Sequence, residues 1–397
     1  MKIGIFGGTF NPPHIGHLQS AKTAAKQLGL DRLLIVPAGA PPHKPLPEGT
    51  PSADVRLSLV HATFDDVRGA AVSDIEIKDS KFKYTVDTVK AIKKEYNGAR
   101  MFLLVGADMF LSLGTWKDSE SLLKSVTPAV FSRNADDNRN ISVYSDELQE
   151  LFGTRTEIIE NDVLDISSSQ LRRLLPQREG VRYITDTTYS YIIKGRLYGA
   201  KPDWAWLRGK AYAMLDPKRV PHVAGCESEA VKLAERWGAD VDDAREAGIL
   251  HDITKKLDTA EHIGILAQNG IYIKNLQNSE EKLLHPKSGA ALARTVFGVS
   301  DEVSNAIMWH TTGRRGMSLL EKVIYLADYI EPERDIPGID ELRKEAYADI
   351  DKAMIMGMEM SVDDMRSRGI IPNTTTFDAL DDLRERTAPG AIIRESR

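Results

Sequence analysis

Two histidines stand close together in a glycine-rich segment near the start of the chain. Residues 7–17 read GGTFNPPHIGH and place His14 and His17 three residues apart, so both side chains point the same way on the first turn of a helix. Glycines let a ligand approach the backbone closely, and the amides of such a turn can face an anion. Two imidazoles at a helix N-terminus beside this turn predict a phosphate-binding site.

A second set of histidines and carboxylates lies in the later half of the chain. Its members are His222, His251, Asp252, His285, His310 and Asp328. Asp328 interrupts a largely apolar helical run over residues 319–330, where an unpaired buried carboxylate needs a cation. Histidine and carboxylate ligands suit Mn, Fe, Co, Ni or Zn, and not an iron–sulfur cluster. With six ligands, two metals bridged by Asp252 are more natural than one closed structural site. His262 has no place in this set, and we interpret it as a surface or core histidine.

The first half of the chain has the pattern of a parallel sheet. Short apolar runs alternate with amphipathic helical stretches, which predicts a mostly parallel sheet covered on both faces. The candidate strands are Lys2–Phe6, Arg32–Val36, Ala71–Ile77, Met101–Val105, Pro128–Phe131 and Glu157–Glu160. Ligands of such sheets bind beyond the carboxyl ends of the strands, so the residues after Phe6, Val36 and Val105 matter most.

The pattern changes after about Gly195. Beyond residue 202 no clear β-type alternation remains, and helical runs follow, one of which ends at Gly238, a residue type common at helix C-caps. The glycines and the proline of residues 195–203 favour a linker there. We therefore expect a Rossmann-like, doubly wound α/β domain over residues 1–197 and an all-α domain over residues 198–397.

Composition excludes several classes of protein. The charge balance is 52 − 58 = −6, and an acidic chain argues against general nucleic-acid binding. A single cysteine, Cys226, cannot form an internal disulfide. The start MKIGIFGGTF lacks the features of a signal peptide, and no run approaches the ~18 apolar residues of a membrane span. We expect a cytoplasmic enzyme that binds neither nucleic acid nor membranes. Whether it forms a homo-oligomer stays open.

The first histidine segment carries a family resemblance. GGTFNPPHIGHL resembles the signature of the HxGH nucleotidyltransferase superfamily, and specifically that of bacterial nicotinate-mononucleotide adenylyltransferases. Further matches follow in order at residues 37–44 (PAGAPPHK), 84–88 (YTVDT), 106–108 (GAD) with Trp116, and 166–172 (ISSSQLR). Two departures keep a short polar side chain: Asn11 stands where Asp is common, and Ser169 where Thr is common.

This resemblance, which covers residues 1 to about 195, implies adenylyl transfer from ATP to nicotinate mononucleotide with Mg²⁺. The nucleophilic phosphate is already ionised, so catalysis requires positioning and charge stabilisation and no general base. The implied catalytic residues are His14, His17 and Arg172; the implied ATP-binding residues also include Gly7, Gly8, Thr9, Phe10, Gly106, Asp108, Ser168 and Ser169; the nicotinate mononucleotide side takes Lys44, Thr85 and Trp116. Another adenylyltransferase or cytidylyltransferase with the same signature is the alternative.

The later histidines carry a second resemblance. Residues 219–222 (RVPH), 248–255 (GILHDITK), 284–286 (LHP), 309–314 (WHTTGR) and 325–332 (YLADYIEP) resemble bacterial HD-domain hydrolases that cleave diadenosine tetraphosphate symmetrically. The match runs from about Lys201 and weakens after about Arg366, with Pro221 and Cys226 as departures. It implies that the six residues named above bind a dinuclear centre, with iron as the metal, which hydrolyses the substrate to two ADP. Lys255 and Arg314 are candidates to neutralise the polyphosphate. The alternatives are another nucleotide phosphohydrolase and a non-catalytic module that senses a dinucleotide.

Overall fold

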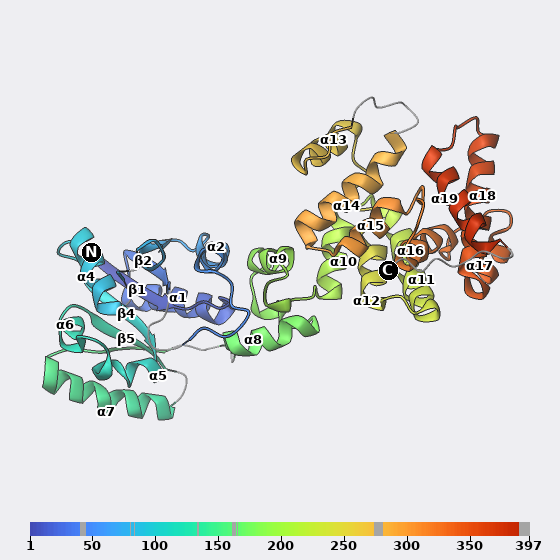
Figure 1. Ribbon diagram of the computed structural model, residues 1–397. Coiled ribbons are helices and arrows are strands. Elements are labelled where there is room, and N and C mark those ends of the chain that lie inside the picture. The colour runs from blue at the N-terminus through green and yellow to red at the C-terminus, as the bar shows by residue number, and fades with distance from the viewer. Residues whose placement is uncertain are drawn as a thin grey trace. The chain divides into compact units, whose positions relative to one another are not determined.

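The structure is a computed structural model that describes residues 1–39, 45–79, 81–82, 84–132, 135–160, 164, 166–273 and 281–388. The chain divides into two compact units, Met1–Asp203 and Trp204–Arg397, which are described separately (Figure 1). The first contains a sheet and the second is helical, so the predicted fold class is confirmed.

The first unit is built on a parallel six-stranded sheet with the order β3-β2-β1-β4-β5-β6. The strands are β1 (Lys2–Gly8), β2 (Arg32–Pro37), β3 (Ala70–Val72), β4 (Arg100–Gly106), β5 (Thr127–Ser132) and β6 (Glu157–Glu160). The strand order changes direction between β1 and β4. In an open parallel sheet, that point forms the crevice in which ligands bind.

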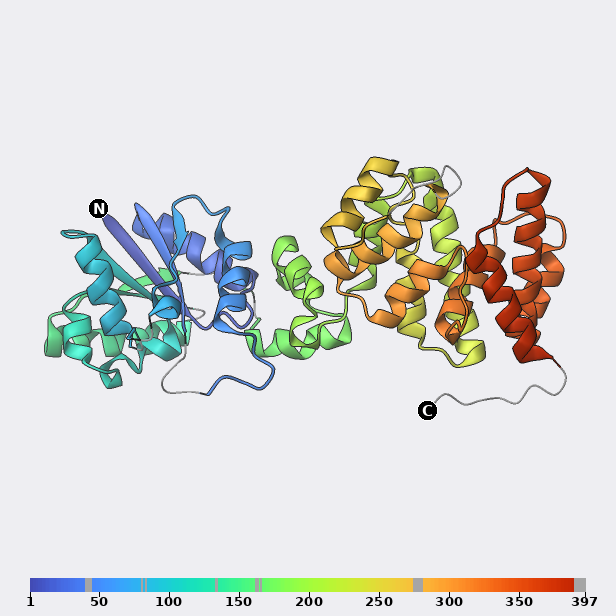
Figure 2. The ribbon, with the colours of Figure 1, turned by 45° about the horizontal axis from the view of Figure 1, so that its top comes forward.

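Helices cover both faces of this sheet (Figure 2). The helices of this unit are α1 (Ile15–Leu28), α2 (Ala53–Phe64), α3 (Ile75–Lys78), α4 (Thr85–Glu95), α5 (Ala107–Phe110), α6 (Ser119–Leu123), α7 (Ala135–Phe152), α8 (Ser168–Leu174) and α9 (Asp186–Lys194). Of these, α1 and α2 pack on one face of the sheet and α4 and α7 on the other. Alternate residues of a strand enter different cores, as a pleated strand requires. Leu34 lies in the core that α4 and α7 cover, whereas Leu33 and Ile35 lie in the core that α1 and α2 cover.

One predicted strand is wrong over most of its length. Ala71–Ile77 was expected to be extended, but β3 ends at Val72 and helix α3 begins at Ile75. The alternation of apolar and polar residues resembles a strand, yet the carbonyl of Asp74 accepts hydrogen bonds from the amides of Ile77 and Lys78 and so closes a helical turn. β3 is an edge strand with only a short pairing to β2, so little holds it extended.

The second unit consists of helices, and its described residues include no strand. The helices are α10 (Trp204–Ala213), α11 (Val220–Trp237), α12 (Val241–Leu250), α13 (Thr259–Gln268), α14 (Leu284–Phe297), α15 (Asp301–Trp309), α16 (Leu319–Ile330), α17 (Ile339–Ala348), α18 (Ile350–Ser367) and α19 (Thr374–Thr387). Helices α11, α12, α15 and α16 pack against one another around one apolar core. The ends of these helices and of α14 carry the second group of predicted site residues.

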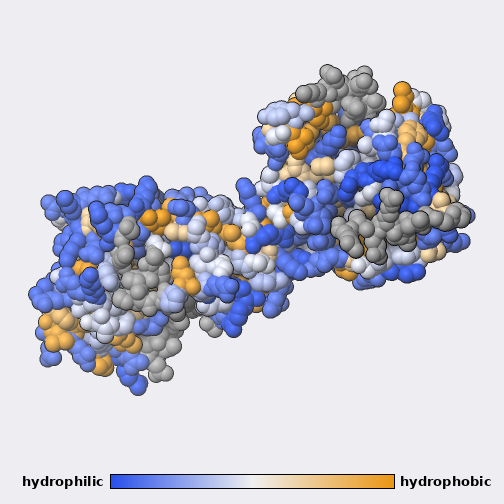
Figure 3. Space-filling model, viewed as in Figure 1, coloured by the Kyte–Doolittle hydropathy of each residue, from blue (hydrophilic) through white to orange (hydrophobic). Residues whose placement is uncertain are grey.

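The division between the units falls after Asp203, whereas the sequence placed the boundary after residue 197. The intervening residues are held on the first unit. Arg178 donates to the carbonyl of Pro202 at 3.0 Å, and the amide of Asp203 donates to the hydroxyl of Tyr189 at 2.8 Å. Within the part of the chain that the structure describes, no helix has the length and apolar character needed to cross a membrane. On the face drawn in Figure 3, hydrophilic residues predominate on both units.

Candidate active site and candidate metal centre

The glycine-rich segment lies at the point where the strand order of the sheet changes direction. β1 ends at Gly8, and α1 begins at Ile15 with His14 as its N-cap residue. On the neighbouring strand, β4 ends at Gly106 and leads into α5, where Asp108 follows. A Cβ on Gly106 would lie 2.9 Å from Oδ1 of Asp108, so a side chain there would displace the carboxylate. Because β1 and β4 pair in parallel, the predicted ATP-binding residues that follow these two strands lie at the same edge of the sheet.

His14 is buried and His17 is partly buried, and their rings lie against each other with centroids 3.7 Å apart. Nδ1 of His17 accepts the backbone N–H of His14 at 3.2 Å, which leaves the His17 proton on Nε2. Burial lowers the pKa of His14 to about 4. Burial, followed by the proximity of His14, lowers the pKa of His17 well below its usual value. Both imidazoles are therefore neutral near pH 7 and can act as hydrogen-bond donors rather than as cations.

Helix α8, which lies much later in the sequence, is hydrogen-bonded to the same segment. Arg172 donates through Nη1 to the carbonyl of Asn11 at 2.6 Å and through Nη2 to Oγ of Ser169 at 3.1 Å. Ser168 donates to the carbonyl of Pro12 at 2.8 Å. These bonds bring the guanidinium of Arg172 to the loop that precedes the histidine pair. It also lines a cavity of about 550 Å³ between the N-terminal end of α2 and residues 195–199.

Arg56 is a positioning residue of this loop that the sequence analysis missed. Its side chain, on α2, is 1% exposed, and it donates to the carbonyl of Thr9 at 2.8 Å and to that of Gly39 at 2.7 Å. Burial lowers the pKa of its guanidinium. Arg56 therefore fixes two of the predicted ligand-binding segments. Its burial could have been predicted from spacing, because Arg56 lies three and four residues before the apolar Leu59 and Val60 and therefore on the same face of α2.

Thr85 and Trp116 are predicted to contact nicotinate mononucleotide. Thr85 is the first residue of α4, and Trp116 follows the short 3₁₀ turn Leu113–Thr115. Their neighbours meet, because the ammonium of Lys117 lies 4.1 Å from the centroid of the Tyr84 ring. Trp116 is partly buried against an apolar core and donates to Ser112 at 3.2 Å. Lys44 lies outside the described residues.

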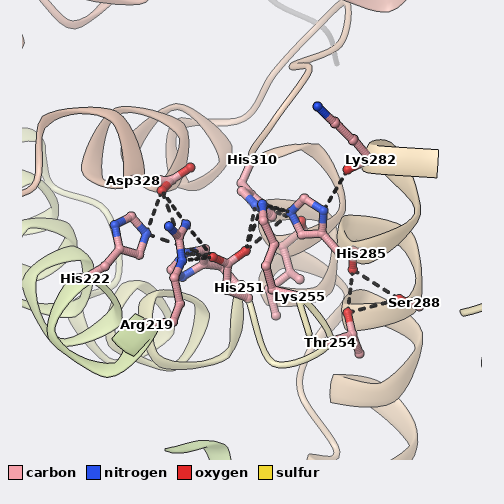
Figure 4. A network of polar contacts seen from close by, with 12 residues as sticks. Arg219, His222, His251, Thr254, Lys255, Lys282, His285, Ser288, His310 and Asp328 are labelled. Atoms are coloured by element: carbon pink, nitrogen blue, oxygen red, sulfur yellow. Dashed lines mark hydrogen bonds and ion pairs between the residues drawn. The ribbon is translucent and has the colours of Figure 1, made fainter. Parts of the chain in front are cut away.

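The six predicted metal ligands of the second unit come together at the ends of five helices (Figure 4). His222 lies on the first turn of α11, His251 and Asp252 at the end of α12, His285 on the first turn of α14, His310 at the end of α15 and Asp328 on the last turn of α16. Residues that are far apart in the sequence thus converge on one buried point. Arg219 and Lys255 lie beside them.

Each histidine is oriented through Nδ1. Three of these nitrogens lie within hydrogen-bond distance of the carbonyl three residues earlier: His251 at 2.8 Å from Gly248, His285 at 2.8 Å from Lys282, and His310 at 2.7 Å from Ile307. Nδ1 of His222 instead lies 3.1 Å from Oε1 of Glu331. Carbonyl and carboxylate oxygens accept, so Nδ1 carries the proton and Nε2 keeps the lone pair that a metal would bind, which at His285 accepts from Nζ of Lys255.

The two oxygens of Asp252 divide the cluster into two halves. Half-site A is Oδ2 of Asp252 with Nε2 of His251 at 3.5 Å and Nε2 of His222 at 4.0 Å, together with Oδ1 of Asp328, which lies 2.9 Å from Nε2 of His222. Half-site B is Oδ1 of Asp252 with Nε2 of His285 at 3.3 Å and Nε2 of His310 at 3.7 Å. Asp252 therefore has the geometry of a bridging ligand.

The chemistry of these atoms fits a divalent cation. Nε2 of His222, Nε2 of His251, Oδ1 of Asp252 and Oδ1 of Asp328 are buried and have no hydrogen-bond partner. Unpaired buried polar atoms are rare in proteins, and here four of them converge with lone pairs facing inward. Two triads, His222–His251–Asp328 and His251–Asp252–His310, have ligand atoms within 4.8 Å of one another. Nitrogen and oxygen donors of this kind bind divalent metals.

Positively charged side chains border both halves. Arg219 donates through Nε to Oδ2 of Asp252 at 2.7 Å, and Nη2 of Arg334 lies 3.5 Å from Oδ1 of Asp328. Lys255 donates to Nε2 of His285 at 2.8 Å. Arg314 instead forms an ion pair with Glu321 at 2.9 Å, so its role toward polyphosphate stays a prediction. Sequence reasoning assigned no role to Arg219, Arg334 or Glu331, although the first and last lie within the quoted motifs.

His262 is a buried histidine outside this cluster, with Nδ1 2.7 Å from Oγ of Ser288.

Comparison with known proteins agrees with this division of the chain. Residues 5–174 match the model of the cytidylyltransferase-like family, and residues 219–333 match that of the HD domain. A probable nicotinate-nucleotide adenylyltransferase of Exiguobacterium sibiricum is 37% identical over 194 residues, which are 49% of this chain and 96% of that protein. One from Geobacter sulfurreducens is 34% identical over 213 residues, 50% of this chain and 98% of that protein. A crystal structure of a predicted HD superfamily hydrolase involved in NAD metabolism from Clostridium acetobutylicum is 38% identical, covers 46% of this chain and 98% of its own, and has a TM-score of 0.44.

Proposed function

The chain belongs, through its first unit, to the nicotinate-nucleotide adenylyltransferase family, and from this premise we propose that the unit transfers an adenylyl group from ATP to nicotinate mononucleotide. The products are nicotinate adenine dinucleotide and pyrophosphate. The observation that carries the proposal is the hydrogen bond from Arg172 to the loop that precedes the histidine pair, at the edge of the sheet where β1 and β4 end.

In the proposed mechanism the protein positions two phosphate groups and stabilises charge. The phosphate of the mononucleotide attacks the α-phosphorus of ATP, and pyrophosphate leaves. The imidazoles of His14 and His17 and the guanidinium of Arg172 donate to the phosphate chain, and the backbone N–H of His14 fixes the donor of His17 at Nε2. Mg²⁺ supplies further charge neutralisation when it is bound with ATP. Asp108 at the adenosine ribose, Ser168 and Ser169 at the phosphates, and Lys44, Thr85 and Trp116 at the mononucleotide complete the proposed contacts.

A substrate comparison tests this proposal. The full-length protein with Mg²⁺ is assayed with ATP or CTP as the donor and with nicotinate mononucleotide, nicotinamide mononucleotide or other phosphate-bearing acceptors. We expect turnover with nicotinate mononucleotide and a lower kcat/KM with the nicotinamide form. Preference for a different acceptor, or for CTP as the donor, would replace the proposed reaction with another member of the superfamily.

For the second unit we propose hydrolysis of diadenosine tetraphosphate to two ADP by a dinuclear metal centre. The HD-domain match and the bridging geometry of Asp252 support the proposal. The ions supply Lewis acidity, which polarises a phosphoryl oxygen and makes a nucleophile of water near neutral pH. Carbonyl and carboxylate oxygens of the chain orient the ligand nitrogens, and Lys255 and Arg314 would neutralise the polyphosphate, with Arg219, which lies against Asp252, as a further candidate. We propose iron as the metal, since the resemblance favours it.

The test is product analysis with metal-reconstituted protein. Symmetric cleavage gives ADP alone, whereas asymmetric cleavage gives ATP and AMP, so chromatography separates the two. Reconstitution of stripped protein with Fe²⁺ under anaerobic conditions, Mn²⁺, Co²⁺ or Zn²⁺ identifies the active metal. A protein that binds the dinucleotide and cleaves none of it in any metal form is a sensor and not a hydrolase. Cleavage of other nucleotides at higher kcat/KM would assign another substrate.

A further inference from the structure

The two halves of the metal centre differ in the groups that orient their histidines. In half-site B, both His285 and His310 have a neutral backbone carbonyl at Nδ1. In half-site A, His222 has the carboxylate of Glu331, which is 3% exposed and is itself held by the amide of Glu333 at 2.7 Å. A carboxylate behind an imidazole makes the opposite nitrogen a stronger metal ligand than a carbonyl does.

The halves also differ in ligand number and negative charge. Half-site A gathers two imidazoles, Asp328 and one oxygen of Asp252. Half-site B gathers two imidazoles and the other oxygen of Asp252. Half-site A has Asp328, its share of Asp252 and Glu331 against Arg219 and Arg334, whereas half-site B has only its share of Asp252 against Lys255, so A is the more negative and attracts a divalent cation more strongly. The first ion is therefore expected at half-site A.

Lys255 competes with a metal ion for a ligand atom of half-site B. Its Nζ donates to Nε2 of His285 at 2.8 Å and lies 3.6 Å from Oδ1 of Asp252, so the ammonium uses a lone pair that a metal needs. At half-site A, Arg219 binds the carboxylate of Asp252, but Nε2 of His222 and Nε2 of His251 keep their lone pairs. The Lys255 side chain is 41% exposed, so it can leave His285 for solvent.

We propose that metal binds this centre in two unequal steps, with half-site A filled first and half-site B filled only when Lys255 releases His285. The inference rests on the dinuclear centre proposed above. A phosphate group of a substrate gives the released ammonium an anionic partner, so binding of the second ion and binding of a phosphate favour each other. Thermodynamic linkage makes this coupling reciprocal. Lys255 is thus a positioning residue that ties completion of the centre to the presence of an anion.

Calorimetric titration of metal-free, full-length protein with Mn²⁺ tests the proposal, since heat and stoichiometry report binding without any turnover. We expect two classes of site whose dissociation constants differ by tenfold or more. In Lys255→Met the dissociation constant of the weaker class falls, while that of the stronger class is unchanged. The control variant Lys256→Met, at a neighbouring exposed residue, leaves both dissociation constants unchanged. In Glu331→Gln the stronger class weakens by about 10–100-fold, the range typical of losing such a partner. Glu333→Gln, whose side chain is exposed, is its control.

The titration is repeated with added inorganic phosphate. We expect phosphate to lower the dissociation constant of the weaker class in the wild type and to have a smaller effect in Lys255→Met. Circular dichroism confirms that each variant is folded. Two equal classes, a single bound ion, or a weaker class that Lys255→Met leaves unchanged would overturn the proposal. A protein that binds Mn²⁺ in the two expected steps and cleaves no dinucleotide would refute the proposed hydrolysis and leave this inference standing.

Discussion

Acid should destabilise the first unit through His14. The unfolded chain has a histidine pKa near 6.5, whereas burial holds the pKa of folded His14 at about 4. Between these values the unfolded state binds more protons than the folded state, so stability falls as the pH is lowered through that window and is unaffected above it. From pH 6.5 to pH 5 the loss is about 1.4 kcal/mol per pH unit, or about 2 kcal/mol for this residue alone. His17, with its pKa lowered in the same direction, adds to the loss.

The matched variant is His14→Asn, which cannot titrate and keeps a side chain that is favourable at a helix N-cap. Urea unfolding at pH 7 and pH 5, read by hydrogen exchange of the peptide that contains β1, measures the stability of this unit. We expect the variant to lose about 2 kcal/mol less than the wild type over that pH interval. NMR titration of the imidazole gives the pKa directly. An equal acid sensitivity in both proteins, or a His14 pKa above 6, would refute the reasoning.

Three further outcomes are expected. His17→Ala should lower adenylyl-transfer kcat by about 10²–10³, as for the loss of one preorganised donor, while the exposed His61→Ala stays within a few-fold of wild type in steady-state assays. Arg56→Met, which leaves the carbonyls of Thr9 and Gly39 without their donor, should destabilise the first unit by about 2–3 kcal/mol in urea titrations and raise KM, whereas the exposed Arg68→Met changes stability by less than about 0.5 kcal/mol. Asp252→Ala should abolish dinucleotide cleavage and metal binding at both halves but leave adenylyl transfer intact; a parallel loss of adenylyl transfer would show that the units are coupled.

The sequence predicted the residues whose environment is local and missed those defined by distant partners. Five of six strands lie where they were predicted. Four of them, β1, β2, β4 and β5, are buried apolar runs, because a strand between two layers of helices must be apolar on both faces, whereas the edge strand β6 buries only Ile159. Ala71–Ile77 failed because alternation at a sheet edge does not separate a strand from a short helical turn. Asp328 could be identified because burying an unpaired carboxylate in an apolar helix costs free energy, and it does lie within the cluster.

The partners of charged residues could not be predicted in the same way. Glu331 orients His222 across 109 positions of the chain, and Arg56 reaches Thr9 across 47. Neither contact follows from helical spacing or composition, since each exists only once helices have packed. The same holds for Arg314. The sequence predicts that it binds polyphosphate, and it could not reveal that the guanidinium forms an ion pair with the buried Glu321.

Three ligands of the metal centre are oriented from within their own turn of chain. His251, His285 and His310 each have a carbonyl partner three residues earlier, so their orientation needs no contact between helices. His222 differs, because it lies at the start of α11 while its partner Glu331 follows the end of α16. Its orientation therefore depends on the packing of these two helices. A separation of the two helix ends would release His222 and leave the other three imidazoles oriented.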